Sequence, residues 1–472
     1  MTDCCESSNT PHLVVVGGGS AAFSAAIEAQ SLGARVTIVN DGLPMGGTCV
    51  NVGCVPSKFL LRAAEAHHVP SRRGFDGIEG ESRLDYRKVV EQKRGLVDEL
   101  QTAKYADIIE SHDAVSYRQG EAHFESRRRV VVDGEVIEPD RILVATGASP
   151  GIPSIEGLDE VDYLTNETAF ELETPPDSLA VIGGGYVGLE CAQLFSRFGT
   201  DVTVLDHTDI LPGVARDVSA GLADCLRDEG IAVTEGAEVV GVRSRGTDVE
   251  LRVEEGDGHR TVGVDEVLLA TGRRPNTDRL NGGDAGIELD REGFVETDES
   301  LETAADGVFA AGDVIGEPMY VYTAAYEGKL AARNALGDGR SSIDYGPLPW
   351  VVFTDPQVAG VGLDERRAAE EGFEPQATTL PLSEVPRAIA ARDTRGSIKL
   401  IRDVPTDRLL GGRIVAPEGS ELLMELAMAI RHETTVDELV DTLHPYLTLS
   451  EGIRLAALTF DKSVDELSCC AG

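Results

Sequence analysis

Residues 12–40 read HLVVVGGGSAAFSAAIEAQSLGARVTIVN: an apolar β-forming run, a glycine turn, an amphipathic stretch of helical period and a second β run. Residues 178–206, SLAVIGGGYVGLECAQLFSRFGTDVTVLD, repeat this order. Each segment predicts a βαβ unit with a dinucleotide pyrophosphate at the helix N-terminus, because free N–H groups and the helix dipole favour anions there. Two complete units in one chain predict two bound dinucleotides.

The glycines of the second unit have separate predicted roles. Gly183 permits the tight turn, Gly185 lets the backbone approach a pyrophosphate, and Gly188 brings the helix close to the strand. The predicted cofactor-binding positions are Gly17, Gly19, Ser20 and Ala21 in the first turn and Gly183, Gly185, Tyr186 and Val187 in the second.

Three later segments have the pattern of buried strands that end in glycine turns. RILVATGASP (141–150) and EVLLATGRRP (266–275) echo each other, and GVFAAGDV (307–314) ends in Gly312 and Asp313. The Asp313 carboxylate is predicted to hold ribityl or ribose hydroxyls of a cofactor; the alternative is a turn aspartate that caps the next helix. The candidate cofactor residues in these segments are Thr146, Gly147, Gly272, Gly312 and Asp313.

The predicted fold class is α/β, with two Rossmann-like dinucleotide-binding domains and a C-terminal α+β domain. The first nucleotide domain is expected to comprise residues 1–150 and 273–345, and the second residues 151–272. From residue 346 to 472 the pattern changes to strands (WVVF, RGSIKLIRD, LLGGRIVAP) followed by long helical stretches.

The charge balance excludes one class of function. Acidic residues outnumber basic residues 82 to 42, giving a net charge of −40, and no basic stripe for nucleic acid is present. The acidic residues are spread along the chain, which predicts a hydrated surface suited to a salt-rich cytoplasm. No apolar run long enough for a membrane span occurs, and the polar start MTDCCESSNT does not resemble a secretory signal.

Eight cysteines are too few for a disulfide scaffold in a chain of this length. Cys191 and Cys225 fall in apolar helical patterns and are predicted to be core residues. The other six form three closely spaced pairs, which indicate redox or metal chemistry: Cys4 with Cys5, Cys49 with Cys54, and Cys469 with Cys470.

The central pair lies in GGTCVNVGCVPSK, residues 46–58. Cys49 and Cys54 are close enough for a labile disulfide across one helical turn, with Gly53 providing slack. Their position after a dinucleotide unit suggests that they exchange electrons with its cofactor. The alternatives are a structural clip, or half of a zinc site whose other ligands are not apparent.

The motifs quoted above resemble those of the flavoprotein disulfide reductases over essentially the whole chain, with a glutathione reductase-like fold. Within that family, four segments of this chain resemble the mercuric reductases: VVFTDPQVAGVG (351–362), VPRAIAARDTRG (385–396), PYLTLSEG (445–452) and the tail SCCAG. The resemblance implies FAD, NADH or NADPH, and a homodimer in which the C-terminal dimerisation domain of one subunit covers the disulfide of the other. Gly47, Thr48 and Lys58 are implied FAD contacts.

The implied reaction reduces Hg(II), delivered as a thiol complex, to volatile Hg(0) for mercury detoxification. Hydride passes from NAD(P)H to FAD, and the reduced flavin opens the Cys49–Cys54 disulfide. Cys54 becomes the thiolate nearest the flavin, and Cys49 exchanges ligands. Because Hg(II) is a soft cation that prefers thiolates, the pair Cys469/Cys470 is expected to hand the metal inward, so all four cysteines are metal ligands.

Other residue roles also follow from the resemblance. Tyr186 and Tyr446 would flank the metal, and Tyr186 would gate the nicotinamide pocket. Lys58 would lie near flavin N5, paired with Glu190.

Disulfide reductases of this family carry HPTxxE, whose histidine is an acid–base group. In the ungapped register Tyr446 takes that position, whereas a backbone bulge would return the role to His444.

Three features depart from the pattern. Asn40 stands where an acidic residue should bind the adenosine ribose, unless a one-residue shift brings in Asp41. Asp206 favours the free 2′-hydroxyl of NADH over NADPH, and only His207 and Arg216 offer nearby positive charge. Cys4 and Cys5 replace a separate metal-capturing domain and are either a minimal collecting site or a solvated tail.

Two other functions compete with mercury reduction. A dihydrolipoamide dehydrogenase would explain Asp206, GGGYVGLE and His444, but it gives no role to the terminal cysteines. A thiol protein that only sequesters soft metals would not need the nucleotide motifs.

Overall fold

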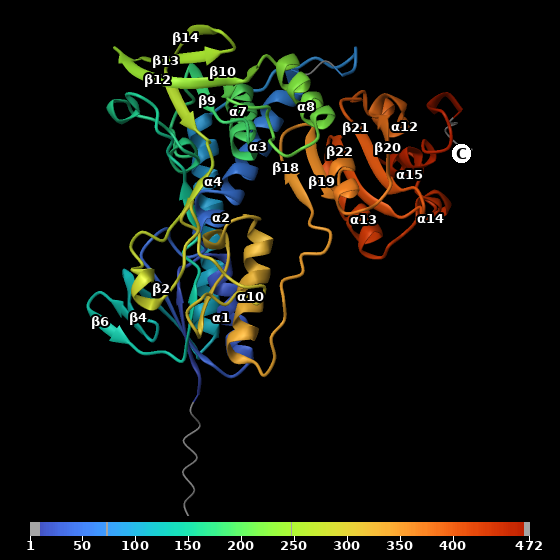
Figure 1. The fold of residues 1–472 in the computed structure, drawn as a ribbon. Helices are drawn as coiled ribbons and strands as arrows, with labels where there is room; N and C mark the ends of the chain where they lie inside the picture. Colours follow the sequence, from blue (N-terminus) through green and yellow to red (C-terminus); the bar gives the residue numbers. More distant parts are fainter. Residues whose placement is uncertain (1–9, 72–73, 247, 467–472) are drawn as a thin grey trace, which may run out of the picture. The chain divides into compact units, whose positions relative to one another are not determined.

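The computed structural model describes residues 10–71, 74–246 and 248–466, drawn as a ribbon in Figure 1. These residues divide into two compact units. The first unit contains the described residues up to Phe59, Lys88–Ile152 and Gly272–Asp344. The second contains Leu60–Arg87, Pro153–Thr271 and the described residues from Tyr345 onward. The predicted cysteine sites at positions 4, 5, 469 and 470 lie outside the described residues.

The first unit is built on a parallel sheet with the strand order β17-β7-β1-β2-β3. Its strands are β1 (His12–Val16), β2 (Arg35–Asn40), β3 (Val115–Gln119), β7 (Arg141–Val144) and β17 (Val308–Ala310). Helices α1 (Ser20–Ser31) and α10 (Val321–Leu336) pack closely, because α1 buries mainly alanines and Gly328 lets α10 approach. A Cβ at Gly328 would lie 2.1 Å from the Ala21 carbonyl oxygen.

Smaller elements complete the first unit, except that Leu60–Arg87, with most of α3 and the start of α4, belong to the second unit. The helices are α2 (Gly47–Asn51), α3 (Cys54–His68), α4 (Tyr86–Gln101), a π-helical turn (Thr102–Ala106), α5 (Asp107–Ser111) and α9 (Gly282–Ala285). A three-stranded antiparallel sheet contains β4 (Ala122–Ser126), β5 (Arg129–Val132) and β6 (Glu135–Ile137), and β8 (Ala148–Pro150) pairs with β16 (Arg273–Pro275).

The second unit contains the other βαβ segment, in a parallel sheet of order β11-β10-β9-β15. The strands are β9 (Ser178–Ile182), β10 (Asp201–Asp206), β11 (Ala232–Glu235) and β15 (Glu266–Leu269). The other elements are α6 (Asn166–Ala169), α7 (Tyr186–Arg197), α8 (Arg216–Asp228) and the antiparallel strands β12 (Ala237–Arg245), β13 (Asp248–Glu255) and β14 (Gly258–Val264).

The C-terminal part is an antiparallel sheet of order β18-β19-β22-β21-β20 with helices packed against it. Its strands are β18 (Trp350–Val352), β19 (Gln357–Gly362), β20 (Pro375–Pro381), β21 (Ser397–Asp403) and β22 (Leu409–Ala416). Its helices are α11 (Glu365–Glu370), α12 (Pro386–Ala391), α13 (Gly419–Arg431), α14 (Val436–Asp441) and α15 (Glu451–Leu458). The three strand segments expected here are present, and the predicted fold class is confirmed.

A buried ionic network joins the two parts of the second unit. Arg197 bridges Glu229 and Asp355, each at 2.8 Å, with its side chain almost fully buried. Arg395 reaches the same two carboxylates at 3.0 and 2.7 Å. Removing one partner of such a network leaves an uncompensated buried charge, which costs about 3–5 kcal/mol.

A buried histidine makes the stability of the first unit depend on pH. His12 is 5% exposed, and its Nε2 lies 2.9 Å from Thr37 Oγ1. Burial, reinforced by the charge of Arg35, lowers its pKa from 6.5 to about 4, against the opposing effect of Asp140. Between these values the unfolded chain binds a proton that the folded chain does not, so stability falls as pH falls through this window.

We therefore expect His12→Gln to reduce the loss of stability between pH 6.5 and 4 by about 2 kcal/mol, after discounting for partial solvent access. Urea unfolding followed by circular dichroism at several pH values measures the difference. His432→Gln, at an exposed position, is the matched control. Equal pH slopes for His12→Gln and the wild type would contradict the prediction.

Candidate functional site

The segment that carries the central cysteines lies directly on the first glycine turn (residues 17–20). The Gly46 backbone N–H donates a hydrogen bond of 2.8 Å to the Gly18 carbonyl oxygen. Gly47 has a φ of +59°, and a Cβ there would lie 2.8 Å from Gly19 Cα. Glycine at position 47 therefore lets the cysteine-bearing helix α2 approach the turn that opens α1.

The two cysteines lie next to each other. Cys49 lies in α2, Cys54 begins α3, and the structure holds them as thiols joined by a hydrogen bond. That bond and burial raise the pKa of Cys49, whereas the charge of Lys58 opposes the rise. A Cβ at Gly53 would lie 2.9 Å from the Thr48 carbonyl oxygen, so this glycine permits the short connection between the helices.

The ends of β7 and β17 meet the same turn from the other side. Gly17 has a φ of +125°, and a Cβ there would lie 2.1 Å from the Ala145 carbonyl oxygen. The neighbouring Thr146 Oγ1 is buried and has no hydrogen-bond partner among the described residues. A Cβ at Gly312 would lie 3.2 Å from Ala21 Cβ, so the turn after β17 touches the start of α1.

Asp313 is half of an ion pair, with its Oδ2 3.4 Å from Arg273 Nε. Burial raises the pKa of Asp313, and the charge of Arg273 opposes that rise. Asp313 is the first residue of the 3₁₀ turn Asp313–Ile315, which follows Gly312. Gly147 and Gly272 adopt φ values of +67° and +113° at the two ATG turns.

These residues fit a dinucleotide. A buried hydroxyl without a partner, a carboxylate beside the helix start and glycines at the closest contacts match the hydroxyls and pyrophosphate of FAD.

At the predicted ribose position, Asn40 rather than Asp41 adjoins the first glycine turn. Asn40 Nδ2 donates to the Leu43 carbonyl oxygen at 2.8 Å and to Tyr117 Oη at 3.1 Å. A Cβ at Gly18 would lie 2.7 Å from Asn40 Cγ. Asp41 instead pairs with Arg279 at 2.8 Å.

The second glycine turn (residues 183–186) is equally tight. Gly183 has a φ of +110°, and a Cβ there would lie 2.3 Å from the Ala270 carbonyl oxygen. A Cβ at Gly188 would lie 2.0 Å from the Gly183 carbonyl oxygen, so α7 is held close to β9. Gly185, by contrast, has open space at its Cβ position, and Val187 is partly exposed beside it.

Asp206 ties this turn to the end of β10. Its Oδ2 accepts a hydrogen bond of 2.6 Å from the Gly184 backbone N–H. Its Oδ1 accepts from the Thr208 backbone N–H and hydroxyl at 2.7 and 2.9 Å. The buried carboxylate therefore joins the glycine turn to the segment after β10, and three of its four lone pairs are engaged.

Tyr186 begins α7 and packs against Trp350, with ring centroids 5.9 Å apart. One turn later, Glu190 is buried and its Oε1 accepts from the Phe353 backbone N–H at 3.0 Å. Glu190 belongs to the second unit and Lys58 to the first, so their pairing stays a prediction.

The two acid–base candidates have different surroundings. Both ring nitrogens of His444 face oxygen acceptors: Nε2 lies 2.7 Å from Glu425 Oε1 and Nδ1 2.9 Å from the Thr442 carbonyl oxygen. Tyr446 is 52% exposed. Glu451 accepts from the Leu447 backbone N–H at 3.1 Å.

Sequence reasoning missed two aromatic residues. Tyr105 lies in the π-helical turn, hydrogen-bonds Ser20 and packs edge-on against Phe23, with ring centroids 4.8 Å apart. Tyr105 could not have been found, because no sequence pattern marks a π-helical turn. The second missed residue is Trp350, which could have been singled out because it is the only tryptophan in the chain.

The prediction that Cys191 and Cys225 are core residues is confirmed for one of them and wrong for the other. Cys191 is a buried core residue as predicted, whereas the core prediction is wrong for Cys225, which is only partly buried because α8 presents it near the surface. Among the described residues, no group of three or more His, Cys, Asp or Glu side chains is arranged to hold a metal ion. The described helices include none with the length and apolar character of a membrane span.

Comparisons with known proteins agree with this geometry. Residues 11–328 match the pyridine nucleotide-disulphide oxidoreductase family, and residues 348–457 match its dimerisation domain. The chain is 41% identical to a mercuric reductase of Staphylococcus aureus, covering 98% of this chain and 84% of the relative. It is 42% identical to a mercuric reductase of Streptomyces lividans, covering 98% of both.

A solved structure is also similar. The Cu(II) complex of an HOCl-induced flavoprotein disulfide reductase from Escherichia coli has a TM-score of 0.86 and 28% identity. The match covers 96% of this chain and 100% of that chain. The chain therefore belongs to the pyridine nucleotide-disulphide oxidoreductase family, whose members are FAD enzymes that use NADH or NADPH.

Proposed function

We propose that this enzyme reduces Hg(II) to Hg(0) with NADH or NADPH, through FAD and the Cys49–Cys54 pair. One observation carries the proposal: two hydrogen-bonded thiols lie on the consecutive helices α2 and α3, and the residue before α2 is hydrogen-bonded to the first glycine turn. The names of the relatives support Hg(II) as the substrate.

The thiol pair is suited to a soft metal ion. Two thiolates offer Hg(II) the ligand type it prefers, and both protons leave as the metal binds. When bound, FAD would accept a hydride from the nicotinamide and supply two electrons. The overall reaction converts NAD(P)H and Hg(II) into NAD(P)⁺, a proton and Hg(0), so charge and electrons balance.

Other residues have proposed supporting roles. Tyr186 would border the nicotinamide, Lys58 and Glu190 would form a pair near the flavin, and Tyr446 would flank the incoming metal. The terminal pair Cys469 and Cys470 would exchange the metal inward from its thiol complex.

The protein is a homodimer through its dimerisation domain, and we infer that each active site is completed by the partner subunit. Exposed apolar residues on α13 and in the segment after α14 support this inference, because a second copy would remove them from water. They are Met424, Met428, Leu443, Tyr446 and Leu447, of which Leu443 is 95% exposed.

The double variant Met428→Asp/Leu443→Asp is expected to raise the dimer dissociation constant at least about a hundredfold, because a charge would be buried at each position. Light scattering measures the mass, and the Hg(II)-dependent rate should fall with the dimer fraction. Val404→Asp alters another exposed apolar residue and should leave the dimer intact. A monomer with full activity would refute the shared site.

The direct test compares two substrates for the purified enzyme in molar salt. NADH and NADPH oxidation are followed with Hg(II) in excess thiol and, separately, with lipoamide. We expect turnover with Hg(II), because the thiol pair offers the ligand type that this ion prefers. We expect little turnover with lipoamide, because both ring nitrogens of His444 already face oxygen acceptors. Lipoamide turnover without a mercury response would favour dihydrolipoamide dehydrogenase.

Two finer points belong to this proposal. Asp206 at the end of β10 favours NADH over NADPH, since its charge would repel a 2′-phosphate. A cytoplasmic location follows from the reaction's consumption of NADH or NADPH.

A further inference from the structure

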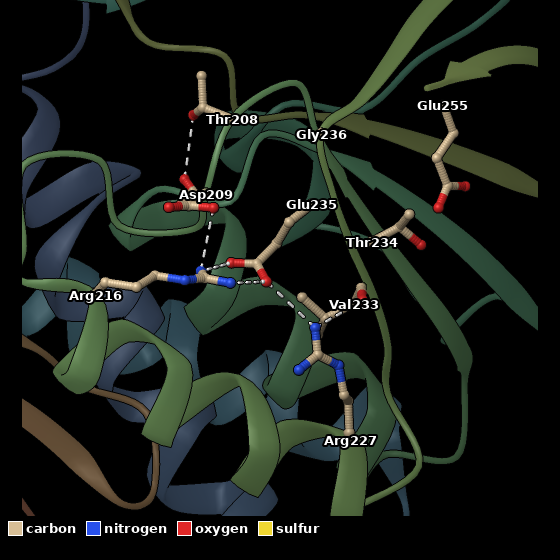
Figure 2. A pocket seen from close by; sticks show the side chains of 9 residues that line it. All are labelled: Thr208, Asp209, Arg216, Arg227, Val233, Thr234, Glu235, Gly236 and Glu255. Atoms are coloured by element: carbon tan, nitrogen blue, oxygen red, sulfur yellow. Dashed lines mark hydrogen bonds and ion pairs between the residues drawn. The ribbon is translucent and has the colours of Figure 1, made fainter. Parts of the chain in front are cut away.

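A cavity of about 520 Å³ lies beyond the carboxyl ends of β10 and β11, where dinucleotides bind to parallel sheets (Figure 2). Asp206, which organises the second glycine turn, pairs with Glu235 in the β10–β11 register. The cavity begins two residues after Asp206, at Thr208. Its charged lining consists of Asp209, Arg216, Arg227, Glu235 and Glu255.

Glu235 holds both arginines of this cavity. Its Oε1 lies 2.5 Å from Arg216 Nη1, and its Oε2 lies 3.1 Å from Arg216 Nη2, so the contact is bidentate. Arg227 Nη2 reaches Oε2 at 3.4 Å, and the Ile210 backbone N–H donates to Oε1 at 3.1 Å. Figure 2 shows the carboxylate between the two guanidinium groups.

The burial of the three side chains differs. Glu235 is only 12% exposed, whereas Arg216 is 53% exposed and Arg227 41%. The arginines hold the pKa of Glu235 below its usual range, Arg216 foremost, so it stays ionised near neutral pH. The carboxylate is thus the fixed element, and its four lone pairs are all engaged by donors.

A guanidinium fork matches a phosphate as well as a carboxylate. Two arginines beside the ribose end of a nucleotide site would be suitable ligands for a 2′-phosphate if they were available. In this chain the Glu235 carboxylate already lies between the two arginines, and Asp209 makes a second ion pair with Arg216 at 3.2 Å.

We propose that Glu235 sets the preference for NADH, because it occupies Arg216 and Arg227 in place of the 2′-phosphate of NADPH. This inference rests on the proposed function, which places the nicotinamide cofactor at the second glycine turn and prefers NADH. Glu235 would act in addition to Asp206, which holds the turn through Gly184 and repels a 2′-phosphate by its charge.

The test measures binding of two fragments, ADP-ribose and 2′-phospho-ADP-ribose, to the oxidised FAD-loaded enzyme by calorimetry at constant salt. Neither fragment carries nicotinamide, so neither turns over and mercury chemistry plays no part. We expect Glu235→Gln to tighten binding of the 2′-phospho fragment at least about tenfold, because both arginines are released. Binding of ADP-ribose should change less than about threefold.

Glu255→Gln is the matched control. It removes the same charge from the same cavity, but Glu255 pairs with Arg260 at 3.2 Å and holds neither Arg216 nor Arg227. Glu255→Gln should tighten binding of the 2′-phospho fragment much less than Glu235→Gln does. Equal gains in the two variants would show a general field effect and overturn the proposal.

Two further variants keep the test decisive. The double variant Glu235→Gln/Arg216→Gln should lose most of the added affinity for the 2′-phospho fragment, because the arginine that Glu235→Gln releases is then removed. Glu235→Asp retains the charge on a shorter side chain, so it should give an intermediate gain and serves if Glu235→Gln folds poorly. No selective tightening in either Glu235 variant would refute the role of Glu235, whether or not the enzyme reduces mercury.

Discussion

Replacing Cys54 with serine is expected to lower the Hg(II)-dependent rate of NAD(P)H oxidation by at least about a thousandfold. Serine nearly keeps the size and the hydrogen-bonding capacity of the side chain but removes one of two soft ligands. A single thiol can neither form the disulfide nor chelate the metal. Initial rates at 340 nm, with Hg(II) in excess thiol, measure the loss.

The same variant should show that the defect lies at the sulfur pair. FAD content and reduction of an artificial electron acceptor by NADH should persist, because neither requires Cys54. The pKa of Cys49, now raised mainly by burial, should fall toward its ordinary value, so its alkylation should speed up at a given pH.

Cys225→Ser is the matched control, because it removes a partly buried thiol from α8, outside the proposed site. It should leave the Hg(II)-dependent rate nearly unchanged. A Cys54→Ser enzyme that keeps more than a tenth of the wild-type rate would show that the pair is not the site of reduction.

The sequence was sufficient to predict the βαβ units because their determinants are local. Gly188 and the Gly183 carbonyl oxygen that it approaches lie five residues apart in the same βαβ unit. The cysteine pair was predictable for the same reason, since Cys49, Gly53 and Cys54 are separated by a few residues.

Features that depend on distant segments were not predictable. The motifs that contain Asp355 and Arg395 were identified by resemblance, but their meeting with Arg197 and Glu229 required the folded chain. Likewise, Glu235 carries no sequence signal, because its partner Arg216 lies in a different element.

The choice between neighbouring candidates also required tertiary contacts. Asn40 and Asp41 are adjacent in sequence, yet one lies on the glycine turn and the other pairs with Arg279. No motif predicts the hydrogen-bond partners of His444, which are Glu425 on α13 and the carbonyl oxygen of Thr442.

Substituting alanine for Gly17 is expected to abolish retention of FAD during purification. The φ of +125° is unfavourable for any residue with a Cβ, and the new atom would lie 2.1 Å from the Ala145 carbonyl oxygen. Neither atom can yield easily, because Ala145 follows the buried strand β7, which pairs with β1. The turn must therefore open, which displaces the helix N-terminus that would bind the pyrophosphate.

Gly33→Ala separates backbone strain from collision. Gly33 lies in the same βαβ unit with a φ of +82°, but nothing lies within 4 Å of its Cβ position. This variant should cost about 1 kcal/mol of stability and keep its flavin. The ratio of absorbance at 450 nm to that at 280 nm reports FAD occupancy for both proteins.

An internal check distinguishes a lost flavin site from a protein that does not fold. The second glycine turn belongs to the other unit, so Gly17→Ala should still bind ADP-ribose. Because flavin loss follows from the contact with Ala145, Gly17→Val should behave like Gly17→Ala rather than like Gly33→Ala. Full FAD occupancy in Gly17→Ala would show that the first turn does not approach its cofactor as the geometry requires.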